Sequence, residues 1–241
     1  SAAIAAASLL FALTTGIVLP VTGSFAVNVV ITIICVVPFT MALTNVEGAP
    51  GTQVTITPVM LAGAAIVGFI RGGNGLEPTA LAAAGACIGV AAWCWLGRGS
   101  RLATAGSMFL AFTSLGIGCG FGGKAGISVL AIGIGLLVIP VTDFFVVVEG
   151  RRRAGNLYWG HGGDHLYDRI RARGLTNRGA IAVILGAATV GVTASCLTAG
   201  EVIVWPVGLC IAWTMKLSLT YWAVRAPLPA TKPIRLGLRY E

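Results

Sequence analysis

The chain has 241 residues, of which 56% are hydrophobic and 10% charged, and its mean hydropathy is +0.91. This composition excludes an ordinary soluble domain, because several apolar runs reach the length that a bilayer-spanning helix requires. The formal net charge of +8 does not indicate a nucleic-acid partner, because most arginines fall at residues 151–178 and 225–239 without interleaved aromatic residues.

The apolar runs predict an all-α, polytopic membrane helix bundle, since backbone polar groups in hydrocarbon must be satisfied within their own segment. The alternating pattern of barrel strands is absent from the sequence. We expect one membrane domain over residues 1–241 with eight spans, the third of them short and the fifth polar. These spans cover residues 2–20, 23–43, 54–70, 77–96, 102–121, 125–148, 179–197 and 202–224.

The basic loops predict how the bundle is oriented. If the loop at residues 149–178 is cytoplasmic by the positive-inside rule, alternation places residues 44–53 and 97–101 on the same side. The basic tail at residues 225–241 then falls on that side as well. One orientation therefore accounts for nearly all the positive charge.

Small residues and cysteines indicate helix packing. The pairs Gly85/Gly89 and Gly116/Gly120 have the spacing that allows membrane helices to approach closely. The cysteines lie in or beside apolar runs without metal-ligand spacing, and we expect them to be buried free thiols. They are Cys35, Cys87, Cys94, Cys119, Cys196 and Cys210.

Two ionisable residues, Asp143 and Lys216, fall within predicted spans. Charge at that depth is costly and is usually paired or functional. Three alternatives remain open: a mutual ion pair, a functional role, or a Lys216 side chain that snorkels to the interface.

Three loop segments share a pattern. Residues 163–176 read GDHLYDRIRARGLT and follow the sequence PVTD at residues 140–143. Residues 44–51 read TNVEGAPG, and residues 102–110 read LATAGSMFL. The predicted topology puts all three segments on the cytoplasmic face.

These segments resemble motifs of the polyprenyl-phosphate sugar-1-phosphate transferases, which include enzymes that start peptidoglycan and cell-wall polysaccharide lipid precursors. That family has P-x-x-D-T and then R-D-H-x-H-H-R-L and R-x-G-L-S in its last cytoplasmic loop. Its earlier loops carry N-x-x-D-G-x-D-G and x-G-D-x-G-S-x-x-L. The resemblance implies a bacterial plasma-membrane protein, and membrane lipids, polyprenyl phosphate and proteins of a membrane complex as partners.

The family's reaction joins a sugar-1-phosphate from a UDP-sugar to a lipid phosphate. Negative charge builds up on the phosphoryl oxygens, so the reaction needs Mg²⁺ and carboxylates that bind this ion. This chain departs from that requirement: Thr104 and Pro50 replace motif aspartates, and Tyr167 and Asp168 replace motif histidines. The chain opens on Ser1 without an initiator Met, and we expect it to lack the family's N-terminal helices with their Asp-Asp pair. We therefore expect no cofactor and no metal ligand, with Mg²⁺ required only if the chain is an active enzyme.

Residue matching supplies candidates for an active enzyme. The catalytic candidates are Glu47, His165 and Asp168, and the substrate-binding candidates are Asn45, Gly48 and Arg169. A structural alternative places His165 and Asp168 at the start of a short amphipathic helix, with Arg169, Arg171 and Arg173 facing lipid head groups.

Our first interpretation is an inactive relative of these transferases that serves as a structural or accessory subunit of a membrane complex, or as a lipid-carrier-binding protein. The alternative is a divergent active transferase. A transporter is a weaker third class, because no broken half-helices recur at matching places in two halves.

Overall fold

The structure is a computed structural model of the whole chain. It describes residues 2–45, 51–73, 75–95, 106–107, 109–111, 114, 128–154 and 165–226, with only the backbone of residues 2, 41, 43–45 and 154. Every regular element in these ranges is helical, so the all-α prediction is confirmed for the described part of the chain.

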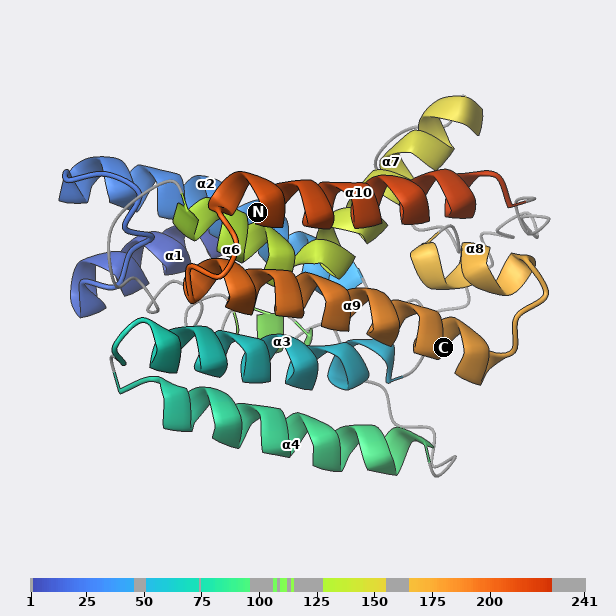
Figure 1. Cartoon of the computed structure of the whole chain (residues 1–241), viewed down its shortest axis with the longest axis horizontal. Coiled ribbons are helices and arrows are strands. Elements are labelled where there is room, and N and C mark those ends of the chain that lie inside the picture. Colours follow the sequence, from blue (N-terminus) through green and yellow to red (C-terminus); the bar gives the residue numbers. More distant parts are fainter. Residues whose placement is uncertain are drawn as a thin grey trace, which may run out of the picture.

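The helices pack side by side as an elongated bundle (Figure 1). α3, α4, α9 and α10 run along its length, α1 and α2 lie together at one end, and α8 lies at the other. The helices are α1 Ala2–Thr15, α2 Phe25–Asn45, α3 Thr52–Ile70, α4 Glu77–Trp95, α6 Ser128–Leu136, α7 Val138–Ala154, α8 Leu166–Ala172, α9 Asn177–Ala199 and α10 Trp205–Val224.

Four of the described helices are long and apolar enough to cross a membrane: α3, α4, α9 and α10. They match four predicted spans closely. The bent pair α6 and α7 raises the number to five if it forms one span. The described residues thus contain four or five candidate spans instead of the predicted eight, and most of the span predicted at 102–121 lies outside them.

The first predicted span is shorter than expected. α1 ends at Thr15 because Gly16 takes a left-handed conformation, with φ of 69°, and its N–H closes on the carbonyl of Ala12. Fourteen residues reach only about 21 Å, which is less than the hydrocarbon core. The second predicted span, at residues 23–43, corresponds to α2, whose 21 residues run from Phe25 to Asn45.

The span predicted at 125–148 is broken instead of straight. α6 and α7 meet at an angle of 73°, and the break follows Leu136. Pro140 explains its position, because proline has no N–H for the carbonyl of Leu136 and its ring clashes with that carbonyl. Ser195 of α9 supports the end of α6 by donating its hydroxyl to the carbonyl of Ile132 over 2.9 Å.

Glycines allow the central helices to approach closely, but these glycines are not the ones that the sequence predicted. A Cβ at Gly63 would meet Val192, and one at Gly135 would meet Ser195 and Gly191, so α3, α6 and α9 are in close contact. A Cβ added at Gly85 or Gly89 of α4 would instead meet no atom within 4 Å. The prediction that these two mediate close packing is wrong, and Gly116/Gly120 lie outside the described residues.

The outer helix faces are apolar and exposed. Leu81, Ile88 and Trp93 project from α4, and Leu217 and Tyr221 from α10. Exposed apolar surface of this extent is typical of contact with lipid. The described cysteines are free, but only Cys87 is fully buried and Cys210 is exposed, so the expectation of uniformly buried thiols is wrong.

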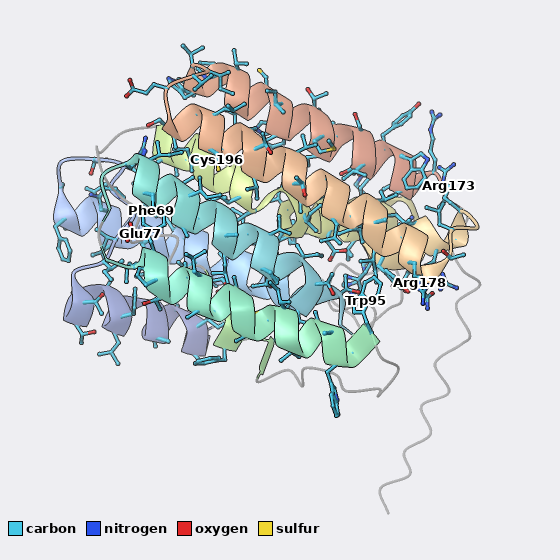
Figure 2. The ribbon with its side chains drawn as sticks, turned by 60° about the horizontal axis from the view of Figure 1, so that its bottom comes forward. Phe69, Glu77, Trp95, Arg173, Arg178 and Cys196 are labelled. Carbon is cyan, nitrogen blue, oxygen red and sulfur yellow. The ribbon has the colours of Figure 1, made fainter. Side chains whose placement is uncertain are left out.

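Charge separates the two ends of the bundle. Arg173 and Arg178 lie at the same end as Trp95, whereas Phe69 and Glu77 lie at the other (Figure 2). We call the first the basic end: there α3 and α9 begin, α4 and α10 end, and α8 lies (Figure 1). Its exposed described arginines are Arg152, Arg153, Arg171, Arg173, Arg178 and Arg225.

Candidate functional site

The junction of α7 and α8 is organised around one buried carboxylate. Asp143, which is 2% exposed, accepts a hydrogen bond from the backbone N–H of Leu166 at 2.7 Å. Its second oxygen lies 3.0 Å from Nδ1 of His165. Asp143 therefore ties α7 to the first residues of α8.

This contact solves a capping problem in the sequence. His165 is the N-cap residue of α8, and its side chain makes no capping hydrogen bond. The first N–H groups of a helix have no partner within the helix, and Asp143 supplies one from α7. An anionic partner there also suits the positive end of the helix dipole.

The same contact fixes the imidazole of His165. An ionised Asp143 can only accept hydrogen bonds, so Nδ1 must carry the proton. A buried carboxylate that orients an imidazole in this way is compatible with either a structural or a catalytic role.

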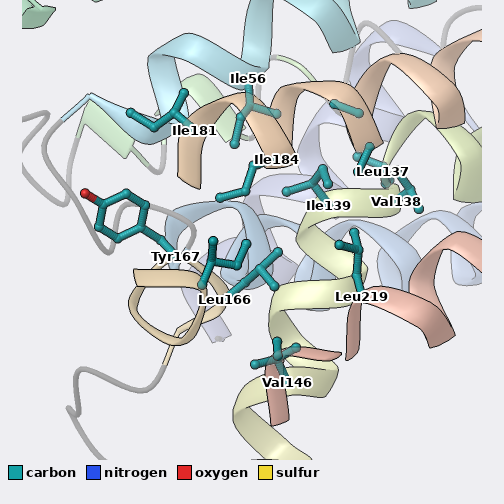
Figure 3. Close-up of a cluster of buried hydrophobic side chains, with 14 of the residues drawn as sticks. Ile56, Leu137, Val138, Ile139, Val146, Leu166, Tyr167, Ile181, Ile184 and Leu219 are labelled. Carbon is teal, nitrogen blue, oxygen red and sulfur yellow. The ribbon is translucent and has the colours of Figure 1, made fainter. Parts of the chain in front are cut away.

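The next motif positions of α8 face the protein. Tyr167 and Ile170 belong to a hydrophobic cluster with residues of α3, α7, α9 and α10 (Figure 3). Burial raises the pKa of the Tyr167 phenol, so this group stays neutral at physiological pH. Tyr167, which replaces a motif histidine, is thus part of the core.

Arg169 is 1% exposed. Its guanidinium lies directly over Gly150 of α7, where even a methyl group would collide with it. The expectation that Arg169 faces lipid head groups is therefore wrong, whereas Arg171 and Arg173 are exposed. The predicted short helix at this place is confirmed, but its inward face includes a charged residue.

Described residues of the three motif segments lie near one another at the basic end. Gly51 ends the first segment and packs against Cys94 at the end of α4, in a left-handed conformation that suits glycine. Gln53, two residues later, donates its amide N–H to the carbonyl of Ser107 in the second segment at 3.1 Å. Ile56 of α3 shares the hydrophobic cluster of Tyr167 in the third segment (Figure 3).

The described residues hold only part of the predicted site. His165, Asp168 and Arg169 lie on α8 or at its start, and Asn45 is the last residue of α2. The candidates Glu47 and Gly48 lie outside the described residues. The motif replacements Pro50 and Thr104 also lie outside them.

Asp143 and Lys216 do not pair with each other. Asp143 binds His165 and Leu166 instead. Lys216, 6% exposed, places its ammonium 3.4 Å from the ring centroid of Phe145 and 3.9 Å from that of Trp213. Two cation–π contacts hold this charge beside α7, so the mutual ion pair is wrong, and the functional and snorkelling alternatives stay predictions.

The described carboxylates do not fit a Mg²⁺ ion. Within the described ranges, no three His, Cys, Asp or Glu side chains gather as a metal site would require. Both oxygens of Asp143 are engaged by hydrogen-bond donors. Magnesium needs oxygen ligands in octahedral array, and this junction does not offer them.

An apolar pocket of about 200 Å³ lies between α2, α3 and α6. Val36, Met60 and Leu137 line its interior, and Arg71 lies at the end of α3 away from the basic end. Its walls suit a hydrocarbon chain, and its described lining residues include no carboxylate or imidazole.

Comparison with known proteins gives one relation. The chain is 30% identical over 207 residues to a protein of Streptomyces coelicolor named "Putative glycosyltransferase". The match covers 82% of this chain and 48% of the relative, so the chain spans about half the length of the curated protein it matches. No protein-family model matches the chain, and no solved structure matches it. The similarity supports a glycosyltransferase-like membrane protein.

Sequence reasoning missed the partners of Asp143 and Arg169. The signal for the first was an aspartate at the end of an apolar run, followed by a helix start without Ser, Thr, Asp or Asn at its cap. No sequence signal indicated the close approach of Arg169 to Gly150, because it depends on how α7 and α8 cross.

Proposed function

We propose that the chain is a membrane protein built like the sugar-1-phosphate transferases in which the motif loop serves structure instead of catalysis. It acts as a structural or accessory subunit of a membrane complex, or as a protein that binds a lipid carrier. The observation that carries this proposal is how the start of α8 is held and which of its side chains are buried. Its start is tied to Asp143, and its Tyr167 and Arg169 side chains are buried.

The electrostatics of the loop support the same proposal. Asp168 stands where the resemblance expects an imidazole, and it brings negative charge to the position where a pyrophosphate would bind. Like charges repel most strongly where water is excluded. The apolar pocket between α2, α3 and α6 supports the lipid-binding form of the proposal.

One observation favours a second candidate, a divergent transferase that moves sugar-1-phosphate from a UDP-sugar to polyprenyl phosphate. The 3.0 Å contact of Asp143 with His165 is the kind of pair that prepares an imidazole for phosphate chemistry. In this alternative Glu47 and Asp168 would supply the carboxylates for Mg²⁺.

A turnover assay separates the two candidates. The natural polypeptide that carries this chain is incubated with labelled UDP-N-acetylhexosamines, polyprenyl phosphate and Mg²⁺, beside an active transferase as the assay standard. We expect no labelled lipid above the protein-free reaction. Mg²⁺-dependent labelled lipid that disappears in Glu47→Gln, but persists in the matched control Glu149→Gln, would establish the transferase instead.

A further inference from the structure

Two arginines are held against the last turn of α10. Arg173, which follows α8, donates from Nη2 to the carbonyl of Trp222 at 2.6 Å. Its guanidinium carbon also lies 5.4 Å from the Trp222 ring centroid. The guanidinium carbon of Arg225 lies 4.0 Å from the ring centroid of Tyr221, the residue before Trp222. Consecutive aromatic residues thus position two guanidinium groups at one helix end.

Both arginines are exposed, and neither forms an ion pair with a carboxylate in the described part of the chain. Arg152 and Arg153 differ in this respect, since both bind Glu149 at 2.7 Å. A guanidinium carries five N–H donors, and the hydrogen bond to Trp222 uses one donor of Arg173. Donors on both groups remain for an anion.

An exposed row of apolar side chains on α10 leads to these two arginines. Trp213, Leu217 and Tyr221 are spaced four residues apart on α10 and are all exposed, Leu217 by 57% and Tyr221 by 58%. Residues four apart lie on one face of a helix, and Arg225 continues the same series. This row of three side chains is therefore apolar, and Arg225 adds a cationic group at its end.

An apolar row of side chains that ends in aromatic residues and arginines matches the shape and charge of a lipid with a phosphate head group. Tyrosine and tryptophan at the end of a span lie at the level of lipid head groups. Arginine binds phosphate through paired, charge-assisted hydrogen bonds. The exposed Arg171 and Arg178 add to the positive field at the same end.

We propose that Arg173 and Arg225, with Trp222 and Tyr221, bind the phosphate of an anionic membrane phospholipid whose acyl chain lies along Trp213, Leu217 and Tyr221. The site lies on the lipid-facing side of α10 and uses no residue of the α7–α8 junction. It is therefore independent of whether the protein transfers sugar phosphate. Its ligand is a lipid with net negative charge instead of a zwitterionic one.

Native mass spectrometry of the full protein, purified in detergent and supplied with phosphatidylglycerol or phosphatidylcholine, tests this site. We expect the wild type to retain phosphatidylglycerol in preference. The double variant Arg173→Gln/Arg225→Gln should retain on the order of tenfold less, since each basic residue near a membrane surface contributes comparably to anionic-lipid binding. The single variant Arg225→Gln, which leaves the hydrogen bond of Arg173 to α10 intact, should lose several-fold.

The matched control is Arg152→Gln/Arg153→Gln, which removes the same charge from the same end where Glu149 already pairs it. This control should retain phosphatidylglycerol like the wild type. Equal retention of the two lipids by the wild type, wild-type retention by Arg225→Gln, or an equal loss in the control would each overturn the site.

Discussion

Asp143 is a buried carboxylate on α7 with partners on another element. Its two oxygens serve two different groups, an imidazole and a backbone N–H, and both groups belong to the start of α8. A carboxylate with this degree of burial needs such donors, because an unpaired charge in a low-dielectric environment is very costly. Asp143 therefore helps to position α8, in addition to the packing of Tyr167, Ile170 and Arg169.

A double-mutant cycle measures this contribution. Asp143→Asn and His165→Gln each remove one partner of the charge-assisted contact, and we expect a coupling free energy of unfolding of about 1–3 kcal/mol between them. Unfolding in mixed detergents followed by circular dichroism gives the four values. If the two losses simply add to within about 0.5 kcal/mol, the contact contributes nothing to the fold.

Gly150 offers a second residue-scale prediction. Gly150→Ala pushes a methyl group into the guanidinium of Arg169, and we expect it to destabilise the protein by about 1–3 kcal/mol. Gly186→Ala is the matched control, because its Cβ on α9 meets no atom within 4 Å. The control should be neutral or gain up to about 1 kcal/mol from helix propensity. Equal thermal stability of the two variants would contradict the contact.

At the scale of elements, the sequence predicts most where one physical rule dominates. α3, α4, α9 and α10 follow from the length of their apolar runs, because spanning a bilayer sets a minimum length. α1 and the α6–α7 pair differ from prediction through single residues, Gly16 and Pro140, which interrupt otherwise continuous hydrophobic segments. Hydropathy averaged over a window does not register such interruptions.

The role of Pro140 can be tested by removing it. Pro140→Ala restores the N–H that the carbonyl of Leu136 lacks, so the bend should open. Two helical segments at 73° place residues 128 and 153 about 31 Å apart, against about 38 Å for a straight helix. Spin labels at these positions, in a protein with its native cysteines replaced, should move apart by several ångströms. An unchanged separation would assign the bend to packing against Ser195 and Gly191.

For the whole molecule, the convergence of the motif segments was predictable, but what their side chains do there was not. Alternating spans bring loops to one end, and the contacts of Gly51, Gln53 and Tyr167 agree with this. The burial of Tyr167 and Arg169 depends on the crossing of α7, α8 and α9. A linear motif cannot record that crossing, so matching residues to a motif does not tell whether they face substrate or core.

The proposal that the motif loops serve structure instead of catalysis implies that they bind no divalent ion. Mn²⁺ tests it without a choice of sugar or lipid acceptor, because Mn²⁺ prefers the same oxygen ligands as Mg²⁺. Electron paramagnetic resonance of free Mn²⁺ is recorded with UDP-N-acetylglucosamine, with and without the natural polypeptide. We predict the same free Mn²⁺ signal in both samples. Loss of about one Mn²⁺ per protein from the free signal, reversed in Glu47→Gln, would contradict the claim.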